Sequence, residues 1–320
     1  MNNSSKPLVA IRTIVYNHKP YLRDYFEGVI MQKTNFPFVA IVHDDCSTDG
    51  STEIIKEYAE KYPDIIKPIY EEENQWSKHD GALIRIMKEA IAMTGAKYVA
   101  ICEGDDYWIN RDKLQRQVDF LENHSEYQLV CHNAIIHSEE HLWPDRIMCN
   151  FPTGELEVAD IFRYWQMPNA SILVRSNIYS HPVYLDITEN LHGGLCLYVA
   201  AARIGKVYGI AECMSVYRKN AGGVSNGMSF DFVIDVNYKF AYAAKSEDAV
   251  RVIDNKVRKM LSDNYHAYLR GDIVARKAMT AAKRYNKYMA FLVFGDYILR
   301  LPQKFLKKLK KLIKESVNFR

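Results

Sequence analysis

The sequence lacks closely spaced cysteine pairs. Its six cysteines, at positions 46, 102, 131, 149, 196 and 213, are scattered, and none belongs to a CxxC motif. A zinc cluster or a disulfide framework is therefore not expected. Several of these cysteines lie in apolar runs, where cysteine behaves as a small hydrophobic residue. A reducing compartment is the simpler expectation.

Long apolar runs are also missing. The opening residues, Met-Asn-Asn-Ser-Ser-Lys-Pro, lack the apolar core of a signal peptide. The most apolar late stretch, residues 290–301, is interrupted by Gly295, Asp296 and Arg300. A membrane-spanning helix needs about 20 apolar residues, so this stretch is too short and too polar. These absences favour a cytoplasmic protein.

An excess of charge of one sign is absent as well. The 42 basic and 39 acidic residues leave a net charge of only +3 over 320 residues. Nucleic-acid binding is therefore not expected from composition. A hydrophobic fraction of 48% is ordinary for a soluble globular protein, and the length suits one large domain with an appendage.

Strand-like and helix-like segments alternate over the first 130 residues. Apolar and β-branched runs predict strands at 8–16, 38–42, 65–70 and 98–102, with helices at about 20–32, 51–61, 79–93 and 112–122 between and after them. Asp49 or Ser51 is the predicted cap of the second helix. This alternation indicates βαβ units, and hence an α/β, Rossmann-like fold with a mainly parallel sheet flanked by helices.

The chain changes character near residue 228. Residues 128–226 carry mixed signals without a linker-like stretch, whereas helical patterns follow at 228–244, 248–268 and 273–288. We therefore expect one domain at 1–228 and a helical C-terminal region at 229–320.

Two acidic clusters follow predicted strands. Glu103, Asp105 and Asp106 surround Gly104 directly after one strand, and Asp44 and Asp45 follow another. Ligands of parallel sheets bind beyond the carboxyl ends of the strands, where both clusters would meet. Crowded carboxylates need a compensating cation or strong hydrogen bonds, and Mg²⁺ or Mn²⁺ prefers such oxygen ligands. A solvated acidic turn that caps the next helix is the alternative.

Four segments together resemble glycosyltransferase family 2. They are VAIRTIVYN (9–17), HDDCSTDGS (43–51), CEGDDYW (102–108) with KLQ (113–115), and SVYR (215–218) with GGVS (222–225). They occur in the family's order and at family-like distances. The resemblance covers roughly residues 7–225 and implies a GT-A fold that binds a nucleotide-sugar.

The resemblance also implies roles for particular residues. In relatives, the positions that match Ile14, Val15 and Tyr16 touch the nucleotide, and the position of Asp45, beside Asp44, hydrogen-bonds the uracil. The Glu103-Gly104-Asp105 segment looks like the family's DxD motif with Glu first. It implies that Glu103 or Asp105 faces the ribose, and that Asp105 or Asp106 holds a Mn²⁺ or Mg²⁺ ion at the diphosphate.

The chain departs from the family pattern at two positions. Gly194 stands where many relatives have the aspartate that deprotonates the acceptor hydroxyl, and Asn220 stands where a histidine is common. A missing general base typically costs about 10²–10⁴ in rate. His192, Glu189 and Asp186 lie on the same segment and are candidate replacements.

Residues 304–314 predict a basic amphipathic helix. Phe305, Leu309, Leu312 and Ile313 fall on one stripe, and six lysines occupy the remaining surface. Such helices lie at anionic membrane surfaces. We expect a peripheral protein on the inner face of the membrane, although a helix that packs its stripe onto the domain is the alternative.

These expectations combine into an inverting, metal-dependent glycosyltransferase of hexosyl or N-acetylhexosaminyl type. It would move a sugar from a UDP-sugar to a saccharide or lipid-linked saccharide in surface polysaccharide biosynthesis. A catalytically impaired protein that binds nucleotide-sugar or glycan is the second hypothesis. A nucleotidyltransferase is disfavoured, because no Gly-rich phosphate loop follows the first strand.

Overall fold

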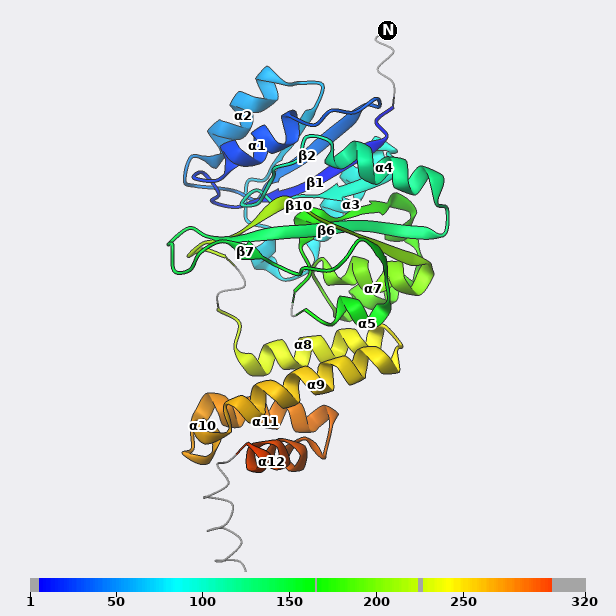
Figure 1. The fold of residues 1–320 in the computed structure, drawn as a ribbon. Coiled ribbons are helices and arrows are strands. Elements are labelled where there is room, and N and C mark those ends of the chain that lie inside the picture. The colour runs from blue at the N-terminus through cyan, green and yellow to red at the C-terminus, as the bar shows by residue number, and fades with distance from the viewer. Residues whose placement is uncertain (1–5, 165, 224–226, 301–320) are drawn as a thin grey trace, which may run out of the picture. The chain divides into compact units, whose positions relative to one another are not determined.

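The computed structural model describes residues 6–164, 166–223 and 227–300. The chain separates into two compact units that divide after Gly223 (Figure 1). A domain boundary at residue 228 stays a prediction.

The first unit is built on one mixed sheet. Four parallel strands lie in the order β3 (Ile66–Tyr70), β2 (Phe38–Asp44), β1 (Val9–Val15) and β4 (Tyr98–Ile101). The order continues through β9 (Leu173–Arg175), β6 (Tyr127–Ser138), β10 (Lys206–Lys219) and β5 (Tyr107–Trp108). Of these, β9 and β5 run antiparallel to their neighbours, while β6 and β10 are parallel. Two short strands, β7 (Arg146–Ile147) and β8 (Gly154–Leu156), pair with β6 and β10.

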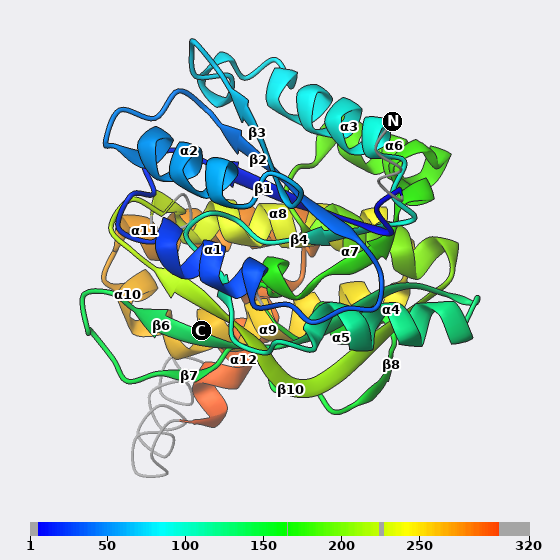
Figure 2. The same ribbon diagram turned by 90° about the horizontal axis from the view of Figure 1, so that it is seen from above.

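Helices cover both faces of the parallel part (Figure 2). Alternate residues of β2 point to opposite faces. Ala40 and Val42 join the large apolar cluster formed with α1 (Leu22–Ile30), α2 (Ser51–Lys61) and α4 (Lys113–Asn123). Ile41 packs instead against Leu83 and Met87 of α3 (Ala82–Thr94). Because both faces are buried, the strands are almost continuously apolar. The α/β prediction is confirmed.

The predicted caps of α2 were wrong. Gly50 occupies the N-cap position with a φ of 96°, a left-handed conformation that glycine adopts readily. The Asp49 carboxylate accepts instead from the backbone N–H groups of Ser51 and Lys19, each at 2.9 Å. It therefore ties the start of α2 to the loop after β1.

The second unit is helical. It contains α8 (Phe230–Ala243), α9 (Glu247–Asp263), α10 (Tyr265–Leu269), α11 (Ile273–Tyr285) and α12 (Met289–Leu299). The single helix predicted at 248–268 is interrupted at Asn264, whose side chain bonds back to the carbonyl of Met260. The sequence analysis missed α12 because Gly295 and Asp296 interrupt its apolar run. Asp296 forms an ion pair with Arg258 of α9.

None of the helices within the described residues is long and apolar enough to cross a membrane. The predicted basic helix at 304–314 lies outside the described residues.

Candidate functional site

The loops after β1, β2 and β4 meet at one edge of the sheet. The parallel register places Val15 beside Asp44 and Arg12 beside Ile101, so the three strands end together. Backbone bonds continue the pairing into the loops, from Asp45 N to the carbonyl of Val15 at 2.9 Å and from Gly104 N to that of Ile14 at 3.1 Å. The structure thus brings both acidic clusters to this edge.

Glu103 is engaged within the protein. Its carboxylate pairs with the Arg12 guanidinium and accepts from the backbone N–H of Ile14 at 3.1 Å. Burial acts to lower the pKa of Arg12, but the charge and hydrogen bond of Glu103, together with the neighbouring Tyr179 and Tyr184, outweigh this and raise the pKa above its ordinary value. Glu103 therefore fixes the β4 loop against β1.

The two aspartates of the same loop have different environments. Asp106 is only 3% exposed, and its Oδ1 accepts from the backbone N–H of Arg218 at 2.9 Å. Burial, with the adjacent Asp105 charge, raises the pKa of Asp106 well above its ordinary range. Asp105 is half-buried and accepts from the Asn220 carboxamide at 3.1 Å. Of the two, Asp105 is the more accessible to a bound ligand.

Gly104 is required by packing. A Cβ at this position would lie 2.8 Å from Val15 Cγ2 and 2.9 Å from His18 Nδ1. Such distances are too short for carbon atoms in contact. The glycine lets the carboxylate loop lie directly on the loop that follows β1.

Asp44 and Asp45 are buried and shape the surrounding loops. Asp44 accepts from the backbone N–H of Ser47 at 3.1 Å. The two oxygens of Asp45 accept from the backbone N–H groups of Gln75 and Trp76, at 2.6 and 3.0 Å. This arrangement holds Trp76, whose side chain is half-exposed, at the same edge of the sheet. A uracil contact by Asp45 stays a prediction.

The loop after β1 is fastened to the loop after β2. Asn17, at a φ of 56°, donates its backbone N–H to Ser47 Oγ at 3.0 Å and accepts from Thr48 N at 2.8 Å. Among the residues predicted to contact the nucleotide here, Val15 is buried, Ile14 is partly buried and Tyr16 is 47% exposed. Tyr16 therefore offers the largest free surface of the three.

One of the three candidate general bases lines a small cavity of about 50 Å³. His192 lines it, together with Arg12 and Gly194. Glu189 is exposed on α6 (Pro182–Asn190) and is not among the lining residues. Asp186, also on α6, is exposed and lies 3.7 Å from Arg203. Of the three candidates, His192 is the one that shares this cavity with Arg12, the partner of Glu103.

Gly194 begins α7 (Leu195–Ile204), and its side-chain position is filled. A Cβ on Gly194 would lie 1.9 Å from Oδ1 of Asn169, a residue of the short helix η2 (Asn169–Ser171). No signal in the sequence linked Asn169 to Gly194, because the two are brought together only by the fold.

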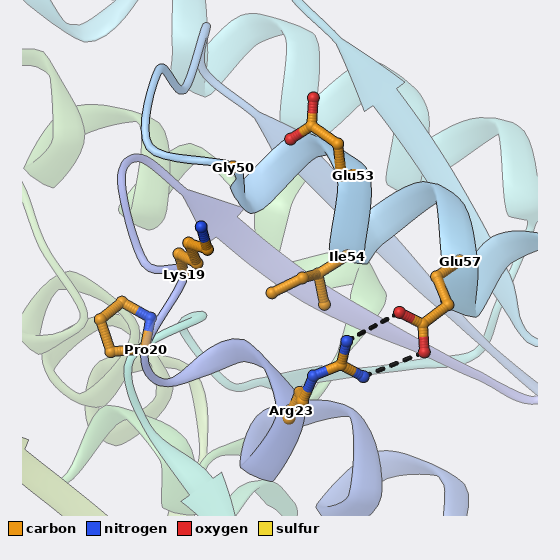
Figure 3. A pocket seen from close by; sticks show the side chains of 7 residues that line it. All are labelled: Lys19, Pro20, Arg23, Gly50, Glu53, Ile54 and Glu57. Atoms are coloured by element: carbon orange, nitrogen blue, oxygen red, sulfur yellow. Dashed lines mark hydrogen bonds and ion pairs between the residues drawn. The ribbon is translucent and has the colours of Figure 1, made fainter.

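A larger groove, of about 640 Å³, lies beside α1 and α2 (Figure 3). Arg23 and Glu57 form two hydrogen bonds across it, at 2.9 and 2.8 Å, and both side chains are about half-exposed. Their charges offset each other in solvent, so we assign this groove no ligand.

Within the described residues, no group of three or more His, Cys, Asp or Glu side chains is arranged to hold a metal ion. Asp105 nevertheless supplies a carboxylate here, and the Asn220 amide nitrogen that donates to its Oδ2 at 3.1 Å belongs to a side chain that also carries an oxygen. Mg²⁺ commonly takes only one or two protein carboxylates, with water and phosphate oxygens completing its shell. The residues at this edge fit that kind of ion.

Comparison with known proteins gives the family. The model of glycosyl transferase family 2 matches residues 11–177, slightly more than half of the chain. An uncharacterized Mycobacterium tuberculosis protein is 30% identical over 224 residues, which cover 68% of this chain and 60% of that protein. The putative teichuronic acid biosynthesis glycosyltransferase TuaG of Bacillus subtilis is 29% identical over 234 residues, or 69% of this chain and 82% of TuaG.

A solved structure shows the same fold. TarS of S. aureus, residues 1–349 in complex with UDP, aligns with a TM-score of 0.61 over 90% of this chain and 88% of that one, at 15% identity. At this identity the likeness concerns the fold alone. The chain therefore belongs to glycosyl transferase family 2, and its fold is that of the GT-A glycosyltransferases.

Proposed function

We propose that the protein transfers a sugar from a UDP-sugar to a saccharide or lipid-linked saccharide, with inversion, in surface polysaccharide assembly. The observation that carries this proposal is the half-buried Asp105 carboxylate at the edge where β1, β2 and β4 end. Two comparisons support it: TarS is solved with UDP and with UDP-GlcNAc, and TuaG is named for teichuronic acid biosynthesis. The transferred sugar would be a hexosyl or N-acetylhexosaminyl group.

Different residues would bind the base and the diphosphate of the donor. Tyr16 and Trp76 offer half-exposed aromatic faces for the base, since such faces stack well on planar rings. Asp105 would hold a Mn²⁺ or Mg²⁺ ion, with Asn220 or Asp106 beside it. When bound, the ion offsets the charge of the diphosphate leaving group.

The acceptor hydroxyl needs a base. We assign this role to His192, because it lines the cavity that also contains Arg12, the partner of Glu103. Histidine is the side chain that most often transfers protons in general acid–base catalysis. Glu189, on the neighbouring helix, is the second candidate.

One observation favours a second function. The Asn169 carboxamide fills the space above Gly194, where many relatives carry the base, and a carboxamide cannot accept a proton at neutral pH. A protein that binds a nucleotide-sugar but turns it over slowly or not at all is consistent with this arrangement.

Calorimetry with UDP and Mn²⁺ tests the nucleotide site. We expect Asp105→Asn to weaken Mn²⁺-dependent UDP binding at least tenfold, because a charged ligand of the ion is lost. The matched control, Asp112→Asn, changes an exposed aspartate near the start of α4 and should bind as the wild type does. Failure of the wild type to bind UDP would refute the proposal.

Turnover separates the two functions. Release of UDP from a panel of UDP-sugars, measured with and without saccharide acceptors, identifies an enzyme. Tight binding without acceptor-dependent release would favour the impaired protein.

We also propose that the protein binds an anionic membrane surface through residues 304–314. The described helix just before this segment, α12, supports the idea. Its residues Phe291 and Leu299 are 76% and 80% exposed. Exposed apolar side chains next to a lysine-rich segment are typical of proteins that lie at a lipid interface.

A further inference from the structure

Two residues that line one cavity carry buried donors without partners. Within the described part of the chain, Arg12 Nε and the Tyr179 hydroxyl are shielded from solvent and have no hydrogen-bond partner. Both residues line the cavity of about 50 Å³ that also contains His192 and Gly194. Tyr179 belongs to the short helix η3 (Ser176–Ser180) and comes from a different part of the chain than Arg12.

A buried donor without a partner is costly, and native proteins seldom leave one. Two of them at one small cavity indicate that a polar group occupies it. Empty cavities are normally apolar, whereas cavities with several polar partners hold water or a ligand atom.

The charges around the cavity select a neutral occupant. Arg12 already pairs with the Glu103 carboxylate, and Asp105 follows in the same loop. A carboxylate or phosphate placed here would meet this excess of negative charge. A hydroxyl accepts from the Arg12 N–H and exchanges a hydrogen bond with Tyr179, without adding charge.

The cavity is well placed for a sugar. Arg12, which lines the cavity, bonds to the loop that carries Asp105, and His192 and the start of α7 line the cavity as well. The Asn169 carboxamide lies against Gly194 at that end. A group in this cavity would therefore lie beside His192, the proposed base, and beside Arg12, which is bonded to the loop of the proposed diphosphate ligand.

Building on the proposed function, we propose that this cavity is a subsite for one hydroxyl of a substrate sugar, held by Arg12 Nε and the Tyr179 hydroxyl. The hydroxyl belongs to either the donor sugar or the acceptor saccharide. Both present the same chemistry, so the test has one arm for each.

Tyr179→Phe removes the hydroxyl and keeps the ring. The donor arm measures the affinity of UDP, UDP-glucose, UDP-galactose and UDP-GlcNAc by calorimetry with Mn²⁺. The acceptor arm measures binding of methyl glucoside and methyl galactoside to the UDP-saturated protein by saturation-transfer NMR. Tyr62→Phe, at the end of α2, is the matched control.

We expect unchanged UDP affinity in Tyr179→Phe and a loss of sugar affinity of about fivefold to a hundredfold in one arm, which identifies the source of the hydroxyl. The midpoint of thermal unfolding should not fall, because the lost hydroxyl has no partner in the free protein. Thermal data thereby separate a lost contact from a damaged fold.

Equal sugar affinities in the variant and the wild type would refute the proposed subsite. The occupant of the cavity would then be a structural water. The same conclusion holds if the wild type binds UDP, but its affinity for UDP-sugars does not exceed that for UDP and neither methyl glycoside binds. If the wild type fails to bind UDP, the proposed function itself fails, and the subsite fails with it.

Discussion

Gly28 of α1 lies directly against the backbone of Trp108. A Cβ on Gly28 would be 2.8 Å from both the nitrogen and the carbonyl oxygen of Trp108. Trp108 is almost fully buried, and its indole N–H donates to the carbonyl of Ala170 at 2.7 Å. The close approach of helix and strand therefore fixes the segment that directly follows Asp105 and Asp106.

Gly28→Ala should destabilise the protein by about 1–3 kcal/mol, because overpacking against backbone atoms cannot be relieved by rotating a side chain. Chemical denaturation measures the change in unfolding free energy. Gly295→Ala in α12 is a matched control, because apart from its chain neighbours and the backbone of its own helix no described atom lies within 4 Å of the new Cβ. It should stabilise by up to about 1 kcal/mol, since alanine is the better helix former. Equal effects of the two substitutions would contradict the close packing.

Lys113 should make stability depend on pH. Its side chain is fully buried, with Nζ 2.8 Å from Gln117 Oε1 and 4.0 Å from the centroid of the Trp108 ring. Burial lowers the pKa of Lys113 to about 7. The unfolded chain keeps this proton until about pH 10.4. Between these values the unfolded state binds more protons, so the Lys113 contribution to stability rises with pH.

Lys113→Met removes the titrating group and keeps most of the packing. The unfolding free energy of the wild type minus that of the variant should therefore increase from about pH 7 to about pH 10, by at most about 1.4 kcal/mol per pH unit. Urea denaturation at several pH values measures it. Parallel stability curves for the two proteins would show that the ammonium stays charged in the folded protein.

Truncation of the C-terminal segment tests the proposed binding to an anionic membrane surface. Removing residues 304–320 should move the protein from the membrane fraction to the soluble fraction, because each lysine near an anionic surface contributes about 1 kcal/mol. Co-sedimentation with vesicles that contain phosphatidylserine measures binding, which should weaken as salt is added. Replacing Lys307, Lys308 and Lys311 by Glu should have the same effect while keeping the length of the chain. Unchanged partitioning of both variants would refute the anchor.

The sequence was sufficient for the strands and helices that form the edge of the sheet. Runs such as Val9–Val15 and Tyr98–Ile101 are apolar because both faces of the sheet are covered, and their ends are marked by polar clusters. Parallel pairing then requires the clusters after β1, β2 and β4 to meet. The acidic site could therefore be located from one-dimensional information.

What each carboxylate does was decided only by the tertiary structure. In the sequence, Glu103, Asp105 and Asp106 are three similar acids in four residues. In the fold, Arg12 engages Glu103, the backbone of Arg218 meets the buried Asp106, and Asp105 is left partly open beside Asn220. These partners are about 90 to 115 residues distant in the chain.

The cavity beside α7 shows the same difference between what the sequence determines and what only the tertiary structure determines. Composition and motif spacing determined the family and the absence of an aspartate at position 194. They gave no sign that Asn169 would fill that space or that Arg12 and Tyr179 would share a cavity. Local patterns depend on neighbours along the chain, whereas hydrogen-bond satisfaction and side-chain volume depend on neighbours in space, which only the folded chain defines.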